Sequence, residues 1–161
     1  MLFGDVQPLA WARILGFLTR TADALIQIRR PQLLMLIRSL IVILAVADGV
    51  LHLALNFVLF GGNLFGPLPF PSPFPLPFNQ LFTLNFIGYL VLALAFWFGP
   101  RLLGRRFWLL DVVLIVYAAL SIIGWVQIGM PNPSGLGFLS KAFEVVLIGA
   151  LIVHMRQRSV E

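Results

Sequence analysis

The sequence contains no cysteine and few charged residues. Asp, Glu, Lys and Arg together make up 11% of its 161 residues, whereas soluble domains contain roughly 25%. The absence of cysteine excludes disulfides, thiolate metal sites and thiol redox chemistry. The shortage of charge, together with 60% hydrophobic residues, excludes a soluble globular domain, a disordered tail and a nucleic-acid-binding module as the main interpretation.

The sequence also lacks the short motifs that mark common enzymes. It contains no glycine-rich phosphate loop, no His-Glu-x-x-His zinc motif and no Gly-x-Ser-x-Gly turn. The largest segment outside the apolar stretches is the N-terminal one, which offers little room for a water-facing active site. We therefore expect no enzymatic activity, no metal ion and no resident cofactor.

Four apolar stretches are each long enough to cross a membrane, which takes roughly 20 helical residues. They cover about 33–60, 81–98, 107–128 and 136–155. Pro31 precedes the first stretch, Gly99 and Pro100 end the second, and Asn132 and Pro133 precede the fourth as N-cap and first helical residue. The pattern predicts an all-α integral membrane protein with a bundle of four transmembrane helices over residues 31–161.

The basic residues fall almost entirely on one side of these stretches. Ten of the eleven precede the first stretch or open it, separate the second from the third, or follow the fourth: Arg13, Arg20, Arg29, Arg30, Arg38, Arg101, Arg105, Arg106, Arg156 and Arg158. Lys141 is the exception. By the positive-inside rule, both termini are expected in the cytoplasm of a bacterium, with the chain in the inner membrane.

Residues 1–30 are expected to form a separate element. Polar and small residues recur at helical spacing between positions 8 and 30, opposite a broader apolar face. This pattern predicts an amphipathic helix on the cytoplasmic membrane surface, with arginines that reach anionic lipid. The alternative is a helix that packs under the bundle or against a partner.

Residues 61–80 form a proline-rich loop. Six prolines alternate with other residues between positions 67 and 77, which excludes a helix and favours an extended, polyproline-like backbone. Four phenylalanines accompany them: Phe65, Phe70, Phe74 and Phe78. A solvated linker would not carry so many aromatic rings, so we expect the loop to dock on a partner subunit. An interfacial loop without a partner is the alternative.

Polar residues inside the predicted spans are costly and mark a candidate functional site. Their depths place them in the outer half of one bundle, as a cluster beneath the proline-rich loop. The predicted members are Asp48, His52, Asn56, Asn85, Tyr89, Gln127, Lys141 and Glu144.

Several roles are open for this cluster. It could serve only to hold the helices together, with Asp48–His52 and Lys141–Glu144 as neutralising pairs. It could bind a quinone head group or a lipid, with His52 and Tyr89 as donors, or hold a tetrapyrrole through His52. A proton path through Asp48, His52 and Glu144 is a further alternative.

Several segments resemble small bacterial four-span membrane proteins to which no activity is assigned. The resemblance covers residues 129–133 and 139–144, Asn63–Leu64–Phe65–Gly66 before the prolines, and residues 85–89. In layout the chain is also similar to DoxX-like four-helix proteins. The resemblance implies four spans and carries no catalytic residue over.

These patterns together favour a non-catalytic accessory subunit of a larger bacterial membrane complex, of the respiratory or photosynthetic electron-transfer kind. Its expected partners are the lipid bilayer and other membrane subunits, with no nucleic acid. The first alternative is a quinone-, lipid- or tetrapyrrole-binding protein with its site near His52. The second is a small transporter or proton carrier.

Overall fold

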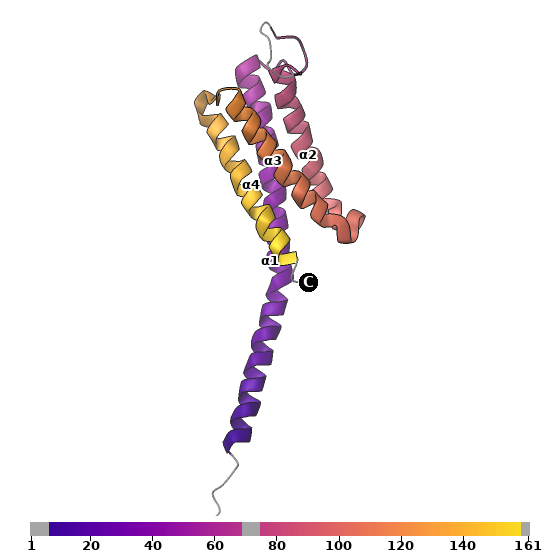
Figure 1. Cartoon of the computed structure of the whole chain (residues 1–161), viewed down its shortest axis with the longest axis vertical. Coiled ribbons are helices and arrows are strands. Elements are labelled where there is room, and N and C mark those ends of the chain that lie inside the picture. The colour runs from indigo at the N-terminus through magenta and orange to yellow at the C-terminus, as the bar shows by residue number, and fades with distance from the viewer. Residues whose placement is uncertain (1–6, 69–74, 159–161) are drawn as a thin grey trace, which may run out of the picture. The chain divides into compact units, whose positions relative to one another are not determined.

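The computed structural model is helical, and it confirms the predicted all-α class. It describes residues 7–68 and 75–158, with side chains from residue 31 onward; this part contains no strand. The elements in chain order are α1 (Gln7–Phe60), α2 (Phe78–Leu103), η1 (Gly104–Phe107), α3 (Trp108–Gln127), η2 (Pro133–Gly135) and α4 (Leu136–Arg158) (Figure 1). The chain divides into two compact units, Met1–Leu36 and Ile37–Glu161.

The first unit ends inside α1. The sequence predicts a break between an N-terminal helix and the first span at Pro31, but α1 continues through this proline. Proline lacks a backbone N–H and therefore removes one helical hydrogen bond. In a helix of 54 residues, the bonds on both sides persist and the helix does not end. The predicted amphipathic face of residues 1–30 concerns side chains that lie outside the described ones.

In the second unit, α2 and α3 lie side by side and run in opposite directions (Figure 1). The predicted end of the second span at Gly99 is too early, because α2 includes Pro100 and continues to Leu103. Gly104 then adopts a φ of +49°, a conformation that glycine reaches at little cost. From there η1 leads the chain into α3.

The connection between α3 and α4 is fixed by side-chain hydrogen bonds. The indole Nε1 of Trp125 donates to the carbonyl of Pro131 at 3.0 Å, and Asn132 Oδ1 accepts from the amide of Phe138, also at 3.0 Å. Asn132 therefore supplies an acceptor to the first turn of α4, but it is not the N-cap residue that the sequence predicts, because the turn η2 intervenes and α4 begins at Leu136. Pro133 opens that turn.

All four helices contribute to one apolar core. Its buried side chains come from α1 (Ile41, Leu44, Ala45), α2 (Tyr89, Ala93, Phe96), α3 (Leu114, Ala118) and α4 (Leu147, Leu151). Gly49 allows α1 and α2 to approach closely. A Cβ at this position would lie 3.1 Å from the Cβ of Tyr89 and 3.2 Å from the carbonyl oxygen of Phe86.

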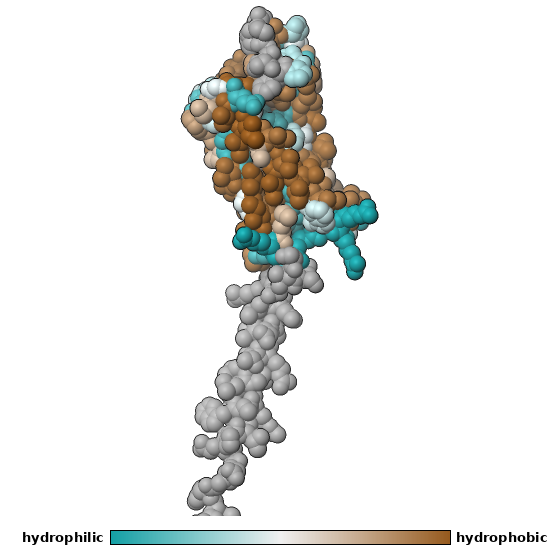
Figure 2. Space-filling model, viewed as in Figure 1, coloured by the Kyte–Doolittle hydropathy of each residue, from teal (hydrophilic) through white to brown (hydrophobic). Residues whose placement is uncertain are grey.

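The outer surface is apolar and the interior holds charge. Ile43, Leu94, Leu120 and Val145, one from each helix, are more than half exposed, and the visible flanks are largely hydrophobic (Figure 2). A protein in water would bury such residues. Three helical stretches, Pro31–Phe60, Phe78–Gln127 and Pro133–Arg158, are long and apolar enough to cross a membrane, which is compatible with a multi-pass membrane protein.

Gly49 and Gly149 provide a matched test of this packing. Gly49→Val should lower the melting temperature of the purified protein, since overpacking a core costs about 1–3 kcal/mol. Gly149→Val should have little effect, because a Cβ there meets no described atom within 4 Å. Thermal unfolding in detergent measures both. Equal melting temperatures for the two variants would contradict the described contact between α1 and α2.

Candidate functional site

A cluster of buried and half-buried polar side chains joins the four helices of the second unit. We call it the central cluster. It comprises Asp48 and His52 from α1, Asn85 and Tyr89 from α2, Ser121 from α3, and Ser140, Lys141 and Glu144 from α4. The pairs on α1 and α2 are four positions apart, and on α4 Glu144 follows Ser140 by four positions and Lys141 by three. Residues at these spacings share one helix face.

The central cluster holds a complete ion pair. The ammonium of Lys141 lies 2.7 Å from both carboxylate oxygens of Glu144, and the hydroxyl of Tyr89 donates to Glu144 Oε1 at 3.1 Å. Glu144 is fully buried. Burying an isolated carboxylate would cost several kcal/mol, so the three hydrogen bonds from these two residues make the position of Glu144 possible.

Asp48 is only half satisfied. Ser140 donates its hydroxyl to Asp48 Oδ1 at 2.7 Å, whereas Oδ2 accepts no hydrogen bond within the described part of the chain. This free oxygen lies 3.6 Å from Nδ1 of His52. Two carboxyl groups face one ammonium, so the cluster carries an excess negative charge unless it holds one further proton.

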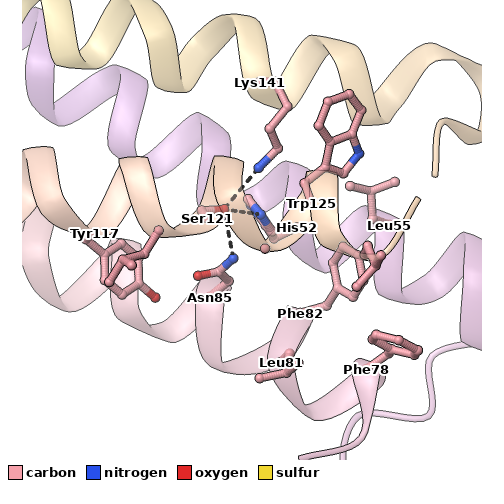
Figure 3. Close-up of a pocket in the computed structure, with 13 residues that line it drawn as sticks. His52, Leu55, Phe78, Leu81, Phe82, Asn85, Tyr117, Ser121, Trp125 and Lys141 are labelled. Carbon is pink, nitrogen blue, oxygen red and sulfur yellow. Dashed lines mark hydrogen bonds between the residues drawn. The ribbon is translucent and has the colours of Figure 1, made fainter. Parts of the chain in front are cut away.

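Ser121 fixes the state of His52. Its hydroxyl oxygen receives hydrogen bonds from Lys141 Nζ at 3.0 Å and Asn85 Nδ2 at 3.2 Å, which uses both lone pairs. The hydroxyl proton is left for Nε2 of His52, at 3.3 Å. The three bonds are the dashed lines of Figure 3. His52 is therefore neutral, with its proton on Nδ1, which donates to the carbonyl of Asp48 at 3.0 Å.

A cavity of about 280 Å³ adjoins Ser121. Apolar and aromatic side chains form most of its wall, and the polar groups of His52, Asn85, Ser121 and Lys141 gather at one place (Figure 3). The remaining lining residues are Leu55, Phe78, Leu81, Phe82, Tyr117, Leu120, Gly124, Trp125 and Ile128. An apolar chamber with a few convergent polar groups is the usual form of a small-molecule site.

Six of the eight predicted cluster residues meet in the central cluster, and two do not. Asn56 belongs to a separate network, where its amide donates to the carbonyl of Asn79 at 2.7 Å and to Thr83 Oγ1 at 3.2 Å. Gln127 is exposed. It lies six residues after Ser121, a rotation of about 240° around the helix, and therefore faces away from the cluster.

The network around Asn56 anchors the start of the proline-rich loop. Asn79 donates to the carbonyls of Asn63 and Gly66, at 2.7 and 2.9 Å, and Thr83 donates to the carbonyl of Leu64. Among the predicted docking residues, Phe65 is 57% exposed, whereas Phe78 opens α2 and lines the cavity. Phe70 and Phe74 lie outside the described residues, so docking of the loop stays a prediction.

Four residues of the site were not predicted from the sequence: Ser121, Ser140, Tyr117 and Trp125. A serine in an apolar span commonly serves only close helix packing, so its type gives a weak signal. Tyr117, Ser121 and Trp125 follow one another at four-residue spacing. They therefore share one face of α3, and this periodicity is the signal that could have found them.

A second buried group lies toward the opposite end of α4. His154 Nδ1 lies 2.7 Å from Asp111 Oδ1, and the guanidinium of Arg158 is 3.9 Å from the same carboxylate. Buried apolar residues separate this group from the central cluster: Ile41, Ala45, Leu114, Ala118, Leu147 and Leu151. The pair ties α3 to the C-terminal end of α4.

The central cluster also contains three potential metal ligands. Ligand atoms of Asp48, His52 and Glu144 all lie within 4.8 Å of one another. The Lys141 ammonium, however, already contacts both oxygens of Glu144, and both ring nitrogens of His52 have hydrogen-bond partners. A divalent ion would have to displace these contacts, so the arrangement favours an internal ion pair.

Comparisons with known proteins give no identification. No family model, no curated protein and no solved structure matches this chain. The resemblance to small four-span proteins and to the DoxX-like layout therefore stays a prediction.

The buried ion pair can be tested with a double-mutant cycle on Lys141→Met and Glu144→Gln. Each single variant leaves a buried polar group without its partner, so each should lower the free energy of unfolding by about 3 kcal/mol. The double variant should lose clearly less than the sum of the two. Chemical unfolding in mixed detergent micelles measures all four proteins, and additive losses would rule out the described pairing.

Proposed function

We propose that this chain is a multi-pass membrane protein whose cavity binds an amphiphile with a carbonyl-bearing head group, either a quinone or a lipid ester. The supporting observation is the cavity beside Ser121, with its apolar wall and its convergent polar groups. This corresponds to the quinone- or lipid-binding alternative of the sequence analysis. It places the head group next to His52.

The donors at the cavity suit a carbonyl oxygen. An amide offers two N–H groups, and Asn85 uses one of them on Ser121, so the second is available to a ligand. Lys141 lines the cavity as well. The rings of Phe78, Phe82, Tyr117 and Trp125 stand in the wall, where they can pack on a flat head group or an acyl chain.

The other ligand and transport alternatives have less support. The His52 ring is only 3% exposed, and axial ligation of a tetrapyrrole through Nε2 would have to replace its bond to Ser121. A proton carrier needs a polar route toward the Asp111–His154 pair. The buried residues described between the two groups are apolar. They offer no polar route for a proton, so they do not favour a proton carrier.

The accessory-subunit role, in a respiratory or photosynthetic complex or another one, stays a prediction. Exposed apolar faces suit a neighbouring subunit and lipid equally well. The cavity makes us favour ligand binding, because a chain that only holds neighbours together would gain stability if side chains filled that space.

We further propose four spans, with both termini on the cytoplasmic side of a bacterial inner membrane and residues 1–30 at its surface. Two observations support this topology. Helices α2 and α3 have 26 and 20 residues, and about 20 suffice to cross the hydrocarbon layer. Arg101, Arg105 and Arg106 follow α2 or lie at its end, and Arg156 and Arg158 end α4, as the positive-inside rule requires.

Single-cysteine variants test this topology, since the chain has no cysteine of its own. In intact cells, a membrane-impermeant maleimide should label Ser134→Cys, which is exposed in η2, and should spare Arg105→Cys in η1. Arg105→Cys should react after the cells are lysed. The opposite labelling pattern would invert the orientation, and labelling of both in intact cells would exclude four spans.

The cavity can be tested by filling it. A Cβ on Gly124 meets no described atom within 4 Å although this glycine lines the cavity, so Gly124→Leu should occupy the space and leave the fold intact. Gly149→Leu is the matched control. Mass spectrometry of the mild-detergent-purified protein should find close to one amphiphile per chain. Gly124→Leu should reduce it at least tenfold.

Refilling distinguishes the two ligand sources. Delipidated protein is titrated with decylubiquinone or with a short-chain phosphatidylcholine, and the fluorescence of Trp125 is followed with Trp125→Phe as background. A saturable response to one of the two, absent in Gly124→Leu, identifies the head group. Equal responses of Gly124→Leu and Gly149→Leu, or no retained amphiphile, would exclude binding in this cavity.

A further inference from the structure

We propose that Ser121 is a nucleophile and His52 its general base, and that the central cluster hydrolyses a carboxylic ester held in the cavity. This inference rests on the proposed binding function and selects the lipid-ester class of ligand. The observation that points to it is the hydrogen bond between Ser121 and His52 at the cavity wall, with a carboxyl oxygen of Asp48 3.6 Å from the other ring nitrogen.

The first requirement, a hydroxyl hydrogen-bonded to a neutral imidazole, is met. Ser121 Oγ lies 3.3 Å from His52 Nε2, and its two acceptor positions are taken, so its proton points at the nitrogen. His52 Nδ1 in turn bonds to the carbonyl of Asp48 at 3.0 Å, which holds the ring in the tautomer that leaves Nε2 basic. Nucleophile–base pairs are often slightly long before substrate binds.

The second requirement is stabilisation of the imidazolium that forms when Nε2 takes the proton. The free Oδ2 of Asp48 is buried and lies 3.6 Å from Nδ1, and Glu144 Oε1 lies 3.8 Å from Nε2. A carboxylate beside the base does this work in known serine hydrolases, and here two carboxyl groups that together face one ammonium supply the negative charge. The proposal therefore gives a role to the one unsatisfied oxygen of Asp48.

The third requirement is a set of donors for the negative charge that develops on the substrate oxygen. Lys141 Nζ and Asn85 Nδ2 both point at Ser121 Oγ, from 3.0 and 3.2 Å, and both residues line the cavity. A carbonyl carbon bonded to Oγ would place its oxygen near the Asn85 amide, which has N–H groups to donate. It would also lie near the positive charge of Lys141, whose own three N–H groups are used on Glu144 and Ser121. The ammonium also favours loss of the Ser121 proton, because it stabilises the oxygen left behind.

The reaction balances without any redox partner. When the ester enters, Asn85 turns its N–H from Ser121 Oγ to the ester carbonyl oxygen, which frees one lone pair of Oγ. Ser121 Oγ then attacks the ester carbon through this lone pair and forms a C–O bond, while its proton moves to His52 Nε2. The ester C–O bond breaks, and the alcohol leaves with that proton, which gives an acyl-Ser121. Water then attacks the acyl carbon with His52 as base, and a carboxylic acid is released. The net change is ester plus water to acid plus alcohol.

No local sequence motif indicates this arrangement, because 69 residues separate His52 from Ser121. Such triads are recognised by geometry and not by sequence spacing. The proposal replaces the sequence-based expectation of a non-catalytic chain. The other serine of the cluster, Ser140, donates its hydroxyl hydrogen bond to Asp48.

A fluorophosphonate probe tests the proposal on the full chain in detergent, with peptide mass spectrometry to locate the adduct. We expect labelling at Ser121 and no labelling at Ser134, which is exposed and serves as an internal control for access. Ser121→Ala should abolish labelling. His52→Gln should slow it at least about 100-fold, whereas His154→Gln, in the distant pair, should label at the original rate.

Gly124→Leu keeps the test decisive if His52→Gln does not fold, since it blocks the cavity and leaves Ser121 and His52 in place. It should remove labelling. An unlabelled Ser121 in the original chain, or labelling that survives in folded His52→Gln or in Gly124→Leu, would overturn the proposal. A retained amphiphile without labelling would leave the binding function standing alone. His52-dependent labelling without a retained amphiphile would support the nucleophile and reject the binding function.

Discussion

The structure depends on the compensation of charge in an apolar interior. Glu144 is fully buried, and the chain satisfies it with Lys141 one turn earlier on α4 and with Tyr89 from α2. Because unpaired charge is so costly in such surroundings, this arrangement fixes the rotation of α4 against α2. The same ammonium reaches Ser121 on α3, so one ion pair determines how three helices meet.

The directions of the other hydrogen bonds in the central cluster follow from this pair, because each donor and acceptor can form only a limited number of bonds. Lys141 and Asn85 saturate the acceptor positions of Ser121, which directs its proton at His52 and leaves that ring neutral. Asp48 keeps one free oxygen beside the ring. Buried polar atoms without a partner also occur in the Asn56 network and in the Asp111–His154 pair. The feature that sets the central cluster apart is the cavity onto which it opens, and this feature points to chemistry at the cluster.

Much of this fold was predictable from the sequence, because a helix long enough to cross a membrane appears in the sequence as a long apolar stretch. Apart from the start of the first stretch, which falls inside α1, the limits of the apolar stretches lie within about five residues of the helix ends. The polar residues Asp48, His52, Lys141 and Glu144 stand out against apolar neighbours. Predictions from the residue type alone failed where the surrounding structure decides the outcome. Pro31 does not end α1 because one lost bond is small in a long helix, and Gln127 turns away because six residues rotate it off the face of Ser121. Ser121 itself was missed since its role comes from a partner on another helix.

The protonation of His52 tests the account most directly. The chain contains two histidines, so ¹⁵N labelling of histidine, with His154→Gln for assignment, isolates the ring by nuclear magnetic resonance. At neutral pH the account predicts a neutral His52 with its proton on Nδ1 and a free Nε2 that accepts the hydroxyl proton of Ser121. A doubly protonated ring, or a proton on Nε2, would contradict it.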